Sequence, residues 1–201
     1  MSEKMNIMVL GASSAIGRSI VKSFANNNRL YLLSTKSEKL EGLKIEALSL
    51  GSKKVELIDC DLRDHIDAEK ILNCDIDMFI NIACSSSGLT NNRVIPSNHE
   101  IHTAVDLTSP LIIIESLLKK MVNRNDNSKL YIIFINTILS KIKSPGNSIY
   151  YSYKILQQEY IDGFRRKYGD TLQSINVIVG RQIDRTKETK QSVNLAKRIK
   201  T

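Results

Sequence analysis

The sequence predicts an α/β fold with a doubly wound, mostly parallel sheet of about six strands and helices on both faces. Three observations predict it. Six short, continuously apolar segments recur along the 201 residues, amphipathic stretches separate them, and a glycine-containing loop directly follows the first apolar segment. Continuous apolar strands are typical of parallel sheets covered on both faces, and their alternation with helices indicates βαβ units.

The predicted elements follow in chain order. The strands cover residues 5–10, 30–33, 55–58, 78–83, 130–135 and 174–179. The first helix carries Ile16, Ile20 and Phe24 at i, i+4 and i+8 and ends at the asparagines 26–28. Later helices are predicted over about 37–50, 64–73, 100–123 and 148–168. Since no repeat or Pro/Gly-rich linker interrupts this pattern, we expect one domain over residues 1–184 and a basic C-terminal tail over 185–201.

Composition is that of a soluble globular protein, with 42% hydrophobic and 25% charged residues. No apolar run reaches the roughly 18 residues of a membrane span, and the start lacks the layout of a signal peptide. The three cysteines and the three histidines are too scattered for a metal site, so we expect none and assign the histidines no function: Cys60, Cys74, Cys84, His65, His99 and His102. Free thiols and no signal peptide predict a cytoplasmic protein.

The net charge of +8 raises the question of nucleic-acid binding. Residues 181–201 supply most of the excess, with seven basic and two acidic side chains. No aromatic residue interleaves with them, and neither a recognition helix nor zinc-finger spacing accompanies them. We therefore expect a solvated basic end and no nucleic-acid partner.

A glycine loop, "GASSAIGR", opens the first helix. Gly11 and Gly17 bracket the strand-to-helix turn, and Ser13 and Ser14 lie between them. A backbone that turns here can approach a diphosphate closely, and the helix N-terminus offers unpaired N–H groups. The context predicts a dinucleotide site, although an ordinary tight turn would also use these glycines.

The stretch "GNSIYYSYKIL" contains three tyrosines and a lysine. Tyr150 and Lys154 are four residues apart and share a helix face, whereas Tyr151 and Tyr153 point elsewhere. A free phenol titrates near pH 10, and a nearby ammonium lowers that pKa. The pair is a candidate for acid–base chemistry.

The loop, its position and the Tyr-x-x-x-Lys pair together resemble the short-chain dehydrogenase/reductase family, over roughly residues 5–184. The family's Thr-Gly-x-x-x-Gly-x-Gly loop falls on Leu10, Gly11, Ala15 and Gly17, so the bracing hydroxyl of its threonine is absent. The resemblance implies a Rossmann-type fold, an NAD(P)(H) cofactor and hydride transfer. The cofactor residues it implies are Gly11, Ser13, Ser14, Ile16, Gly17, Lys36, Asp61, Leu62, Asn81, Ala83, Tyr150, Lys154, Gly180 and Ile183.

Two of these segments have specific roles by resemblance. "CDL" at 60–62 implies that Asp61 bonds the adenine amino group with Leu62 near the ring; a loop-capping carboxylate is the alternative. "NIAC" at 81–84 matches the family at Asn81 and Ala83, and Cys84 in place of glycine narrows the space beside the cofactor.

The end of the second predicted strand bears on nucleotide choice. Ser34, Thr35 and Lys36 stand there without an acid. A basic residue at this place accepts the 2′-phosphate, so NADP(H) is favoured over NAD(H). Lys36 is equally explained as a lysine in the first turn of a surface helix.

The catalytic roles come from the same resemblance. Tyr150 would act as general acid/base, and Lys154 would tune it and hold the nicotinamide ribose. Thr137 stands in the place of the family's serine, with Ser140 as a possible stand-in, and orients the substrate carbonyl. Asp106 replaces the asparagine that holds a relay water, and its charge would alter the relay and the pKa of Lys154.

The sequence thus predicts an NADP(H)-dependent oxidoreductase that interconverts a ketone or aldehyde and an alcohol. The alternative is a catalytically impaired NAD(P)-binding protein, suggested by Leu10, Cys84, Asp106 and Val179 and by an end at Thr201, sooner than family members usually end. The resemblance also implies a homodimer or homotetramer through the helices at 100–123 and 148–168. The apolar residues of those helices are equally explained as intrachain core.

Overall fold

The computed structural model describes residues 4–63, 71, 73–85, 96–124, 128–137, 148–179 and 190–200. The side chains of residues 96–98, 137, 148–151 and 179 lie outside this description. The predicted helix at 64–73 falls almost entirely outside the described residues.

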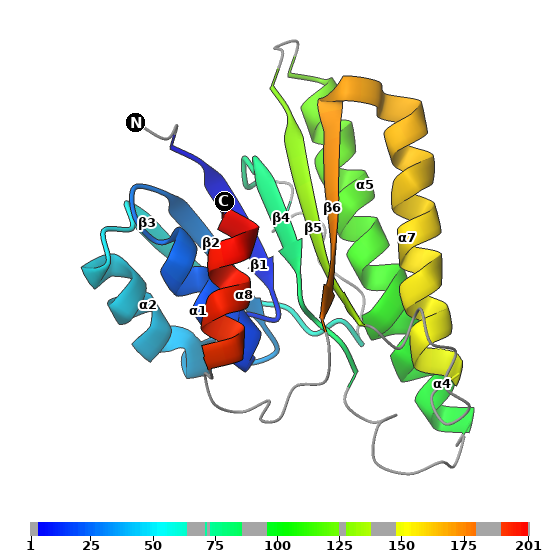
Figure 1. Cartoon of the computed structure of the whole chain (residues 1–201), viewed down its shortest axis with the longest axis horizontal. Helices are drawn as coiled ribbons and strands as arrows, with labels where there is room; N and C mark the ends of the chain where they lie inside the picture. Colours follow the sequence, from blue (N-terminus) through cyan, green and yellow to red (C-terminus); the bar gives the residue numbers. More distant parts are fainter. Residues whose placement is uncertain are drawn as a thin grey trace.

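A six-stranded sheet in the order β3-β2-β1-β4-β5-β6 forms the centre of the protein, and every pairing is parallel. The predicted fold class is therefore confirmed. Figure 1 shows the strand arrows pointing toward one end of the molecule. The strands are β1 Asn6–Leu10, β2 Arg29–Ser34, β3 Lys54–Asp59, β4 Met78–Asn81, β5 Leu130–Thr137 and β6 Leu172–Val179.

Helices connect the strands. The predicted helix 37–50 is divided into a 3₁₀ turn and an α-helix, and the one predicted at 100–123 starts earlier and contains a π-helical turn. The helix predicted at 148–168 is confirmed at both ends. The helical elements are α1 Ala15–Phe24, η1 Ser37–Leu40, α2 Glu41–Ser49, α4 Pro96–Thr103, η2 Ala104–Thr108, α5 Ser109–Val122, α7 Ser148–Tyr168, η4 Gly169–Thr171 and α8 Lys190–Lys200.

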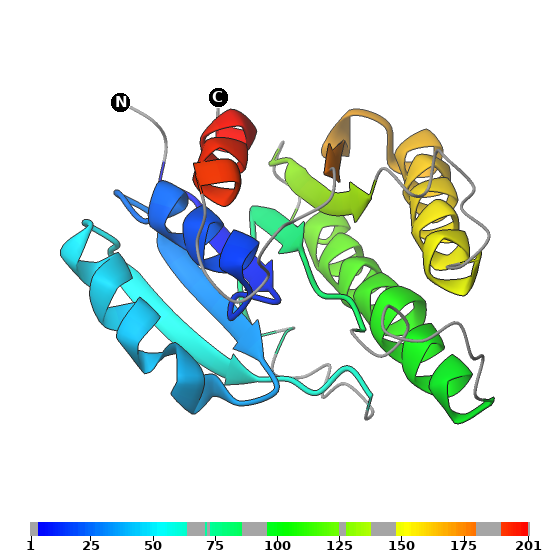
Figure 2. The same cartoon turned by 60° about the horizontal axis from the view of Figure 1, so that its bottom comes forward.

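Two hydrophobic clusters cover the two faces of the sheet. Ile7 and Val9 point into the cluster formed with α1, α2 and α8, whereas Met8 and Leu10 point into the cluster formed with α5 and α7. Successive strand residues face opposite sides, so a strand buried on both faces must be apolar throughout. Figure 2 shows α1 and α8 together on one face and α5 on the other.

The C-terminal residues correct one prediction. A solvated basic tail was predicted over 185–201, but Lys190–Lys200 form helix α8, which packs against α1. Ser192, Leu195, Ala196 and Ile199 recur at i, i+3, i+4 and i+7 and face the core, while the basic residues face solvent. The hydroxyls of Ser19 and Ser192 also bond at 3.0 Å across this contact. The excess of charge had concealed a narrow apolar stripe.

Residues His99–Val122 are the one helical stretch, within the described part of the chain, that is long and apolar enough to cross a membrane. Half of its most apolar window is buried inside the protein. Ile113, Ile114 and Leu118 are buried in the cluster beneath the sheet, so this stretch has the position of a core helix.

Gly17 allows the first helix to start close to the preceding loop, and we predict that Gly17→Ala destabilises the fold. A Cβ at this position would lie 2.4 Å from the Gly11 carbonyl oxygen and 2.8 Å from the Ala12 Cα, both backbone atoms. The backbone has to shift to make room for this Cβ. The shift should lower the free energy of unfolding, measured by urea denaturation, by about 1–3 kcal/mol.

The matched control is Gly163→Ala in the middle of α7, where a Cβ meets no described atom within 4 Å. This change should raise the free energy of unfolding by about 0.5–1 kcal/mol, since alanine has the better helix propensity. Equal effects of the two substitutions would contradict a steric requirement at Gly17.

Candidate functional site

A cleft of about 550 Å³ opens where the strands end. Residues that follow β1, β2, β3 and β4 line it, and Ile101 of α4 and Val105 of η2 close one side. The order of strands reverses between β1 and β4, so the connections after these two strands leave on opposite faces and a crevice stays open between them. Its volume is that of a small-molecule or cofactor site.

The glycine loop forms the floor of the cleft. Gly11 has φ +85°, and a Cβ here would lie 2.8 Å from the main-chain nitrogen of Ala83. Only glycine therefore allows β1 and β4 to approach this closely where they begin to diverge. The close approach is the steric reason for glycine at position 11.

Ser14 braces the turn and caps α1. Its hydroxyl accepts the main-chain N–H of Gly17 at 3.1 Å and donates to the carbonyl of Gly11 at 3.0 Å. The hydroxyl that the sequence lacks at Leu10 is thus supplied four residues later, while Leu10 itself is buried in the core.

The N-terminus of α1 opens onto the cleft beside Ser13 and Ser14. Its first turn contains no acidic residue, so the positive end of the helix dipole is not neutralised from within the helix. The side chain of Ile16 packs in the core, which leaves its main-chain amide as the group available to an anion. Main-chain amides at the start of a helix, such as that of Ile16, are suited to binding a diphosphate.

Asp61 and Arg63 form one end of the cleft. The carboxylate of Asp61 accepts the main-chain N–H of Arg63 at 3.0 Å and its guanidinium Nε at 2.9 Å. The hydrogen bonds from Arg63 lower the pKa of Asp61, so this carboxylate stays ionised. Asp61 caps the loop, as one of the two sequence alternatives has it, and it also lines the cleft; its bond to the adenine stays a prediction. Arg63 was missed, although "CDLR" placed it beside Asp61.

The corner next to β2 differs from the prediction. Ser34 and Thr35 line the cleft, but exposed Lys36 is not among the described lining residues. The sequence showed no acid at this place, yet the carboxylate of Asp59 accepts the main-chain N–H of Ser37 at 2.8 Å. Because β2 and β3 pair in register with Ser34 opposite Asp59, the sheet brings an acid from another strand.

At the other end, the segment after β4 forms a wall. Asn81 is fully buried and its side-chain oxygen accepts the main-chain N–H of Ala83 at 3.1 Å. Its side-chain nitrogen has no hydrogen-bond partner among the described atoms. Ala83 and Cys84 line the cleft, and the thiol of Cys84 is exposed. The side chain at position 84 therefore occupies space that glycine would leave open.

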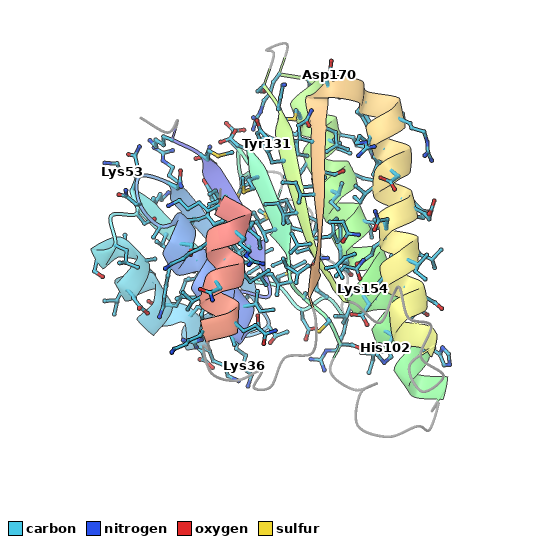
Figure 3. All side chains as sticks on the ribbon, in the orientation of Figure 1. Lys36, Lys53, His102, Tyr131, Lys154 and Asp170 are labelled. Atoms are coloured by element: carbon cyan, nitrogen blue, oxygen red, sulfur yellow. The ribbon has the colours of Figure 1, made fainter. Side chains whose placement is uncertain are left out.

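Lys154 is buried on α7, with 1% of its surface exposed. Its ammonium donates a hydrogen bond to the side-chain oxygen of Gln157 at 3.3 Å. Burial lowers the pKa of Lys154, and Cys84 and Asp106 act in the opposite direction. Figure 3 shows Lys154 and His102 toward the end of the molecule where Lys36 also lies, opposite Lys53, Tyr131 and Asp170.

Asp106 lies in the π-helical turn η2 and is fully buried. Its carboxylate accepts the main-chain N–H of Ser85 at 2.8 Å and the Nδ1–H of His102 at 2.8 Å. The hydroxyl of Ser85 lies against the same ring nitrogen. His102, to which the sequence assigned no function, is therefore part of the site; its spacing of four residues from Asp106 was the available signal.

Several predicted residues are placed only by their main chain or not at all. Thr137 ends β5, with Val179 as its partner on β6, and Tyr150 lies in the first turn of α7, at the end where the strands point (Figure 1). Their side chains are outside the described part. Ser140, Gly180 and Ile183 lie outside the described residues altogether.

Comparisons with known proteins agree with this geometry. The sequence model of the family described as short chain dehydrogenase matches residues 5–194. No curated protein matches the chain.

Solved structures of the same fold are numerous. A 3-oxoacyl-[acyl-carrier protein] reductase from Brucella melitensis with bound NAD has a TM-score of 0.81 and 17% identity, over 98% of this chain and 83% of that one. A short-chain dehydrogenase from Sphingobium yanoikuyae in complex with NADPH has a TM-score of 0.80 and 17% identity, over 96% of this chain and 81% of that one. Serine dehydrogenase from Escherichia coli has a TM-score of 0.78 and 18% identity, over 97% of this chain and 89% of that one. At such identities the likeness shows the fold.

The burial of Lys154 makes stability depend on pH. Because burial lowers its pKa, the folded chain releases this proton at a lower pH than the unfolded chain does. The unfolded chain then binds more protons between the two pKa values, so stability rises as pH increases from the folded value toward about 10.4. Lys154→Met should remove this rise and stabilise the protein near neutral pH by roughly 1–4 kcal/mol.

Urea unfolding of both proteins across neutral and alkaline pH measures this effect. The control is Lys119→Met, which removes an exposed lysine from α5. A parallel pH dependence for Lys154→Met and the unsubstituted protein would show that the buried ammonium imposes no cost.

Proposed function

Since this chain belongs to the short-chain dehydrogenase family, we propose that it is an NADP(H)-dependent oxidoreductase that interconverts a ketone or aldehyde and an alcohol. Membership of the family makes it an oxidoreductase that uses NAD(P)(H). The carbonyl substrate and the preference for NADP(H) are parts of the proposal.

One observation carries the proposal. Tyr150 and Lys154 lie one turn apart on α7, and the ammonium of Lys154 is buried rather than solvated. A buried cation stabilises a neighbouring phenolate more strongly than an exposed one, because the surrounding dielectric is low. We propose that the Lys154 ammonium lowers the pKa of Tyr150 in this way, so that the phenol can serve as general acid and base.

The roles of the residues follow. Tyr150 gives its proton to the carbonyl oxygen during reduction and takes it back during oxidation. The hydroxyl of Thr137 orients that oxygen, and Lys154 tunes Tyr150. To hold the nicotinamide ribose as well, the Lys154 ammonium, which is 1% exposed and is not among the described lining residues of the cleft, has to turn toward the cleft. The bound nicotinamide cofactor supplies or accepts the hydride. Stabilising the developing alkoxide and positioning the reactants account for the acceleration.

The cleft residues fit the cofactor. The main-chain amides of Ser13 and Ile16 would donate to the diphosphate. Gly11, Ser14 and Gly17, whose amides already bond Leu33, Gly11 and Ser14, would shape the loop around it. We propose Asp61 and Leu62 for the adenine, with Asn81 and Ala83 shaping the wall. Gly180 and Ile183 remain proposals from the sequence for the nicotinamide.

The test of the acid–base role is Tyr150→Phe. With a panel of ketones and aldehydes, and NADPH consumption followed by absorbance, kcat should fall on the order of 100- to 10,000-fold. The matched control is Tyr153→Phe on the same helix, whose hydroxyl bonds Thr103 at 2.7 Å. This control should keep kcat within about threefold while losing about 1 kcal/mol of stability. Equal activity of the two variants would refute the role of Tyr150.

Calorimetry with NADPH separates the alternative, an impaired cofactor-binding protein. That alternative is supported if NADPH binds but no carbonyl in the panel is reduced. The charged Asp106 in the place of the relay asparagine is the structural feature that favours it.

The preference for NADP(H) is tested by Lys36→Ala against Lys39→Ala, two exposed lysines at and within η1. Only Lys36→Ala should weaken NADPH binding, by about tenfold, since one charge-assisted bond to the 2′-phosphate is lost. NADH binding should stay unchanged in both variants, as measured by calorimetry.

Asp59 provides a second test of the preference for NADP(H), with the opposite expected effect. Its carboxylate lies at the same corner, so Asp59→Asn should tighten NADPH binding about threefold by removing a repulsive charge. Tighter NADH binding than NADPH binding in the unsubstituted protein would refute the proposed preference.

Assembly and location complete the proposal. We propose a homodimer or homotetramer through α5 and α7, supported by exposed apolar side chains on both helices: Ile112, Ile155, Leu156 and Tyr160. Leu111, Leu117 and Leu118 are instead buried in the core of the subunit. Light scattering measures the state. The three free cysteines support a cytoplasmic location.

A further inference from the structure

The hydrogen bond between Lys154 and Gln157 is one half of a longer connection. The side-chain oxygen of Gln157 accepts from the ammonium, and its side-chain nitrogen donates to the main-chain carbonyl of Asp106. Lys154 and Gln157 are each 1% exposed and Asp106 is 0% exposed. The amide thus spans two elements, and all three residues are almost fully buried.

We propose that Gln157 is a positioning residue, whose amide ties the ammonium of Lys154 to the carbonyl of Asp106 and so holds Lys154 charged and in place. The inference rests on the function proposed above for Lys154 and adds a residue that neither the sequence nor the family resemblance indicated.

A proline explains why this carbonyl is available. Asp106 lies within η2, between α4 and α5. The i+4 donor that an α-helix would offer to its carbonyl is residue 110, which is a proline and has no N–H. The carbonyl of Asp106 faces α7, against which η2 packs. A side chain of α7 can then use it as an acceptor.

The two hydrogen-bond partners of the Gln157 amide allow it only one orientation. A carbonyl and an ammonium need opposite partners, and only an amide offers an acceptor and a donor at the two ends of one planar group. Reversing it would face an NH₂ group toward the ammonium and an oxygen toward a carbonyl. Gln157 follows Lys154 by three residues, so both lie on the same face of α7.

The lack of charge on the Gln157 amide is the second reason why glutamine suits this position. Among the side chains that the structure describes, the charged and titratable groups that face Lys154 are Cys84, after β4, and Asp106, in η2, with His102 of α4 behind Asp106. The carboxylate of Asp106 is held by Ser85 and His102 rather than by Lys154. The side-chain nitrogen of Asn136 on β5 donates to the main-chain carbonyl of Lys154. Gln157 therefore solvates the ammonium without cancelling its charge.

The link also reaches the cleft. Asp106 binds the main chain of Ser85, and Ser85 lines the cleft wall. The chain Lys154, Gln157, Asp106 and Ser85 thus joins α7 to the segment after β4. Buried hydrogen bonds of this kind are costly to break, because the groups left behind find no water. Loss of Gln157 should consequently displace Lys154.

The experiment compares Gln157→Met, Gln157→Glu and the control Gln173→Met. Methionine keeps the length of glutamine and removes both bonds, whereas glutamate keeps an acceptor for Lys154 but offers only oxygen to the carbonyl. Gln173 is half-buried near the start of β6, where its amide bonds Asp170. Three readouts apply: NMR titration of the Lys154 side-chain nitrogen, the pH profile of kcat, and KM for the best carbonyl.

Gln157→Met should lower the titration midpoint of Lys154 by about one pH unit and reduce kcat about tenfold, while KM changes less than twofold. Its pH profile for alcohol oxidation should move to higher pH. Gln157→Glu should raise the Lys154 midpoint yet still reduce kcat several-fold. The control should match the unsubstituted protein in every readout.

Two results would overturn the inference: a Lys154 midpoint in Gln157→Met equal to that of the control, or full kcat in Gln157→Glu, which would make the bond to Asp106 irrelevant. If the unsubstituted protein reduces no carbonyl, the proposed function fails by itself. The NMR titration still decides the role of Gln157 in that case.

Discussion

The buried ammonium of Lys154 is the constraint on which the functional half of this structure depends. Moving a cation out of water is costly unless its hydrogen bonds are replaced, and a lysine so placed tends to lose its proton. A protein selected for stability alone would place an apolar side chain here. The fold instead surrounds Lys154 with polar groups from α7, η2 and the segment after β4.

These polar groups divide two tasks. Gln157 replaces part of the lost hydration, and Asp106 supplies a negative charge that is already engaged with Ser85 and His102. A carboxylate bonded directly to the ammonium would solvate it equally well, but the pair would be neutral and would stabilise a phenolate poorly. A neutral acceptor with a more distant charge keeps a positive field for the neighbouring residue. The arrangement therefore trades stability for electrostatic preorganisation.

The other half of the cleft depends on close backbone approach. Gly11 brings the ends of β1 and β4 together, and Ser14 fixes the turn with two hydrogen bonds. Main-chain amides and the positive end of the helix dipole then face the cleft, and we propose that they, rather than charged side chains, hold the diphosphate. Arg63 lies at one end of the cleft, and Asp59 and the exposed Lys36 lie by the turn after β2.

Local patterns in the sequence determined most of the fold. Runs of apolar residues specified all six strands, because a strand covered on both faces has no polar side. The glycine loop and the spacing of Tyr150 and Lys154 depend on residues close together in the chain, so they were readable without coordinates. The helix at 190–200 was missed for the same local reason, since seven basic residues over 181–201 outweighed its four inward-facing positions.

Tertiary structure alone decided which distant residues meet. Asp59 reaches the end of β2 through strand register, and Gln157 reaches Asp106 across 51 positions of sequence through the packing of α7 on a π turn. His102 lies one helical turn from Asp106 and bonds its carboxylate, which is buried where η2 packs against α7. The spacing of apolar residues in the sequence indicates which face of a helix or strand is apolar. It does not indicate which hydrogen-bond partners the polar side chains have in the folded protein. Hydrogen bonds between elements are set by how those elements pack, and that is a property of the whole fold.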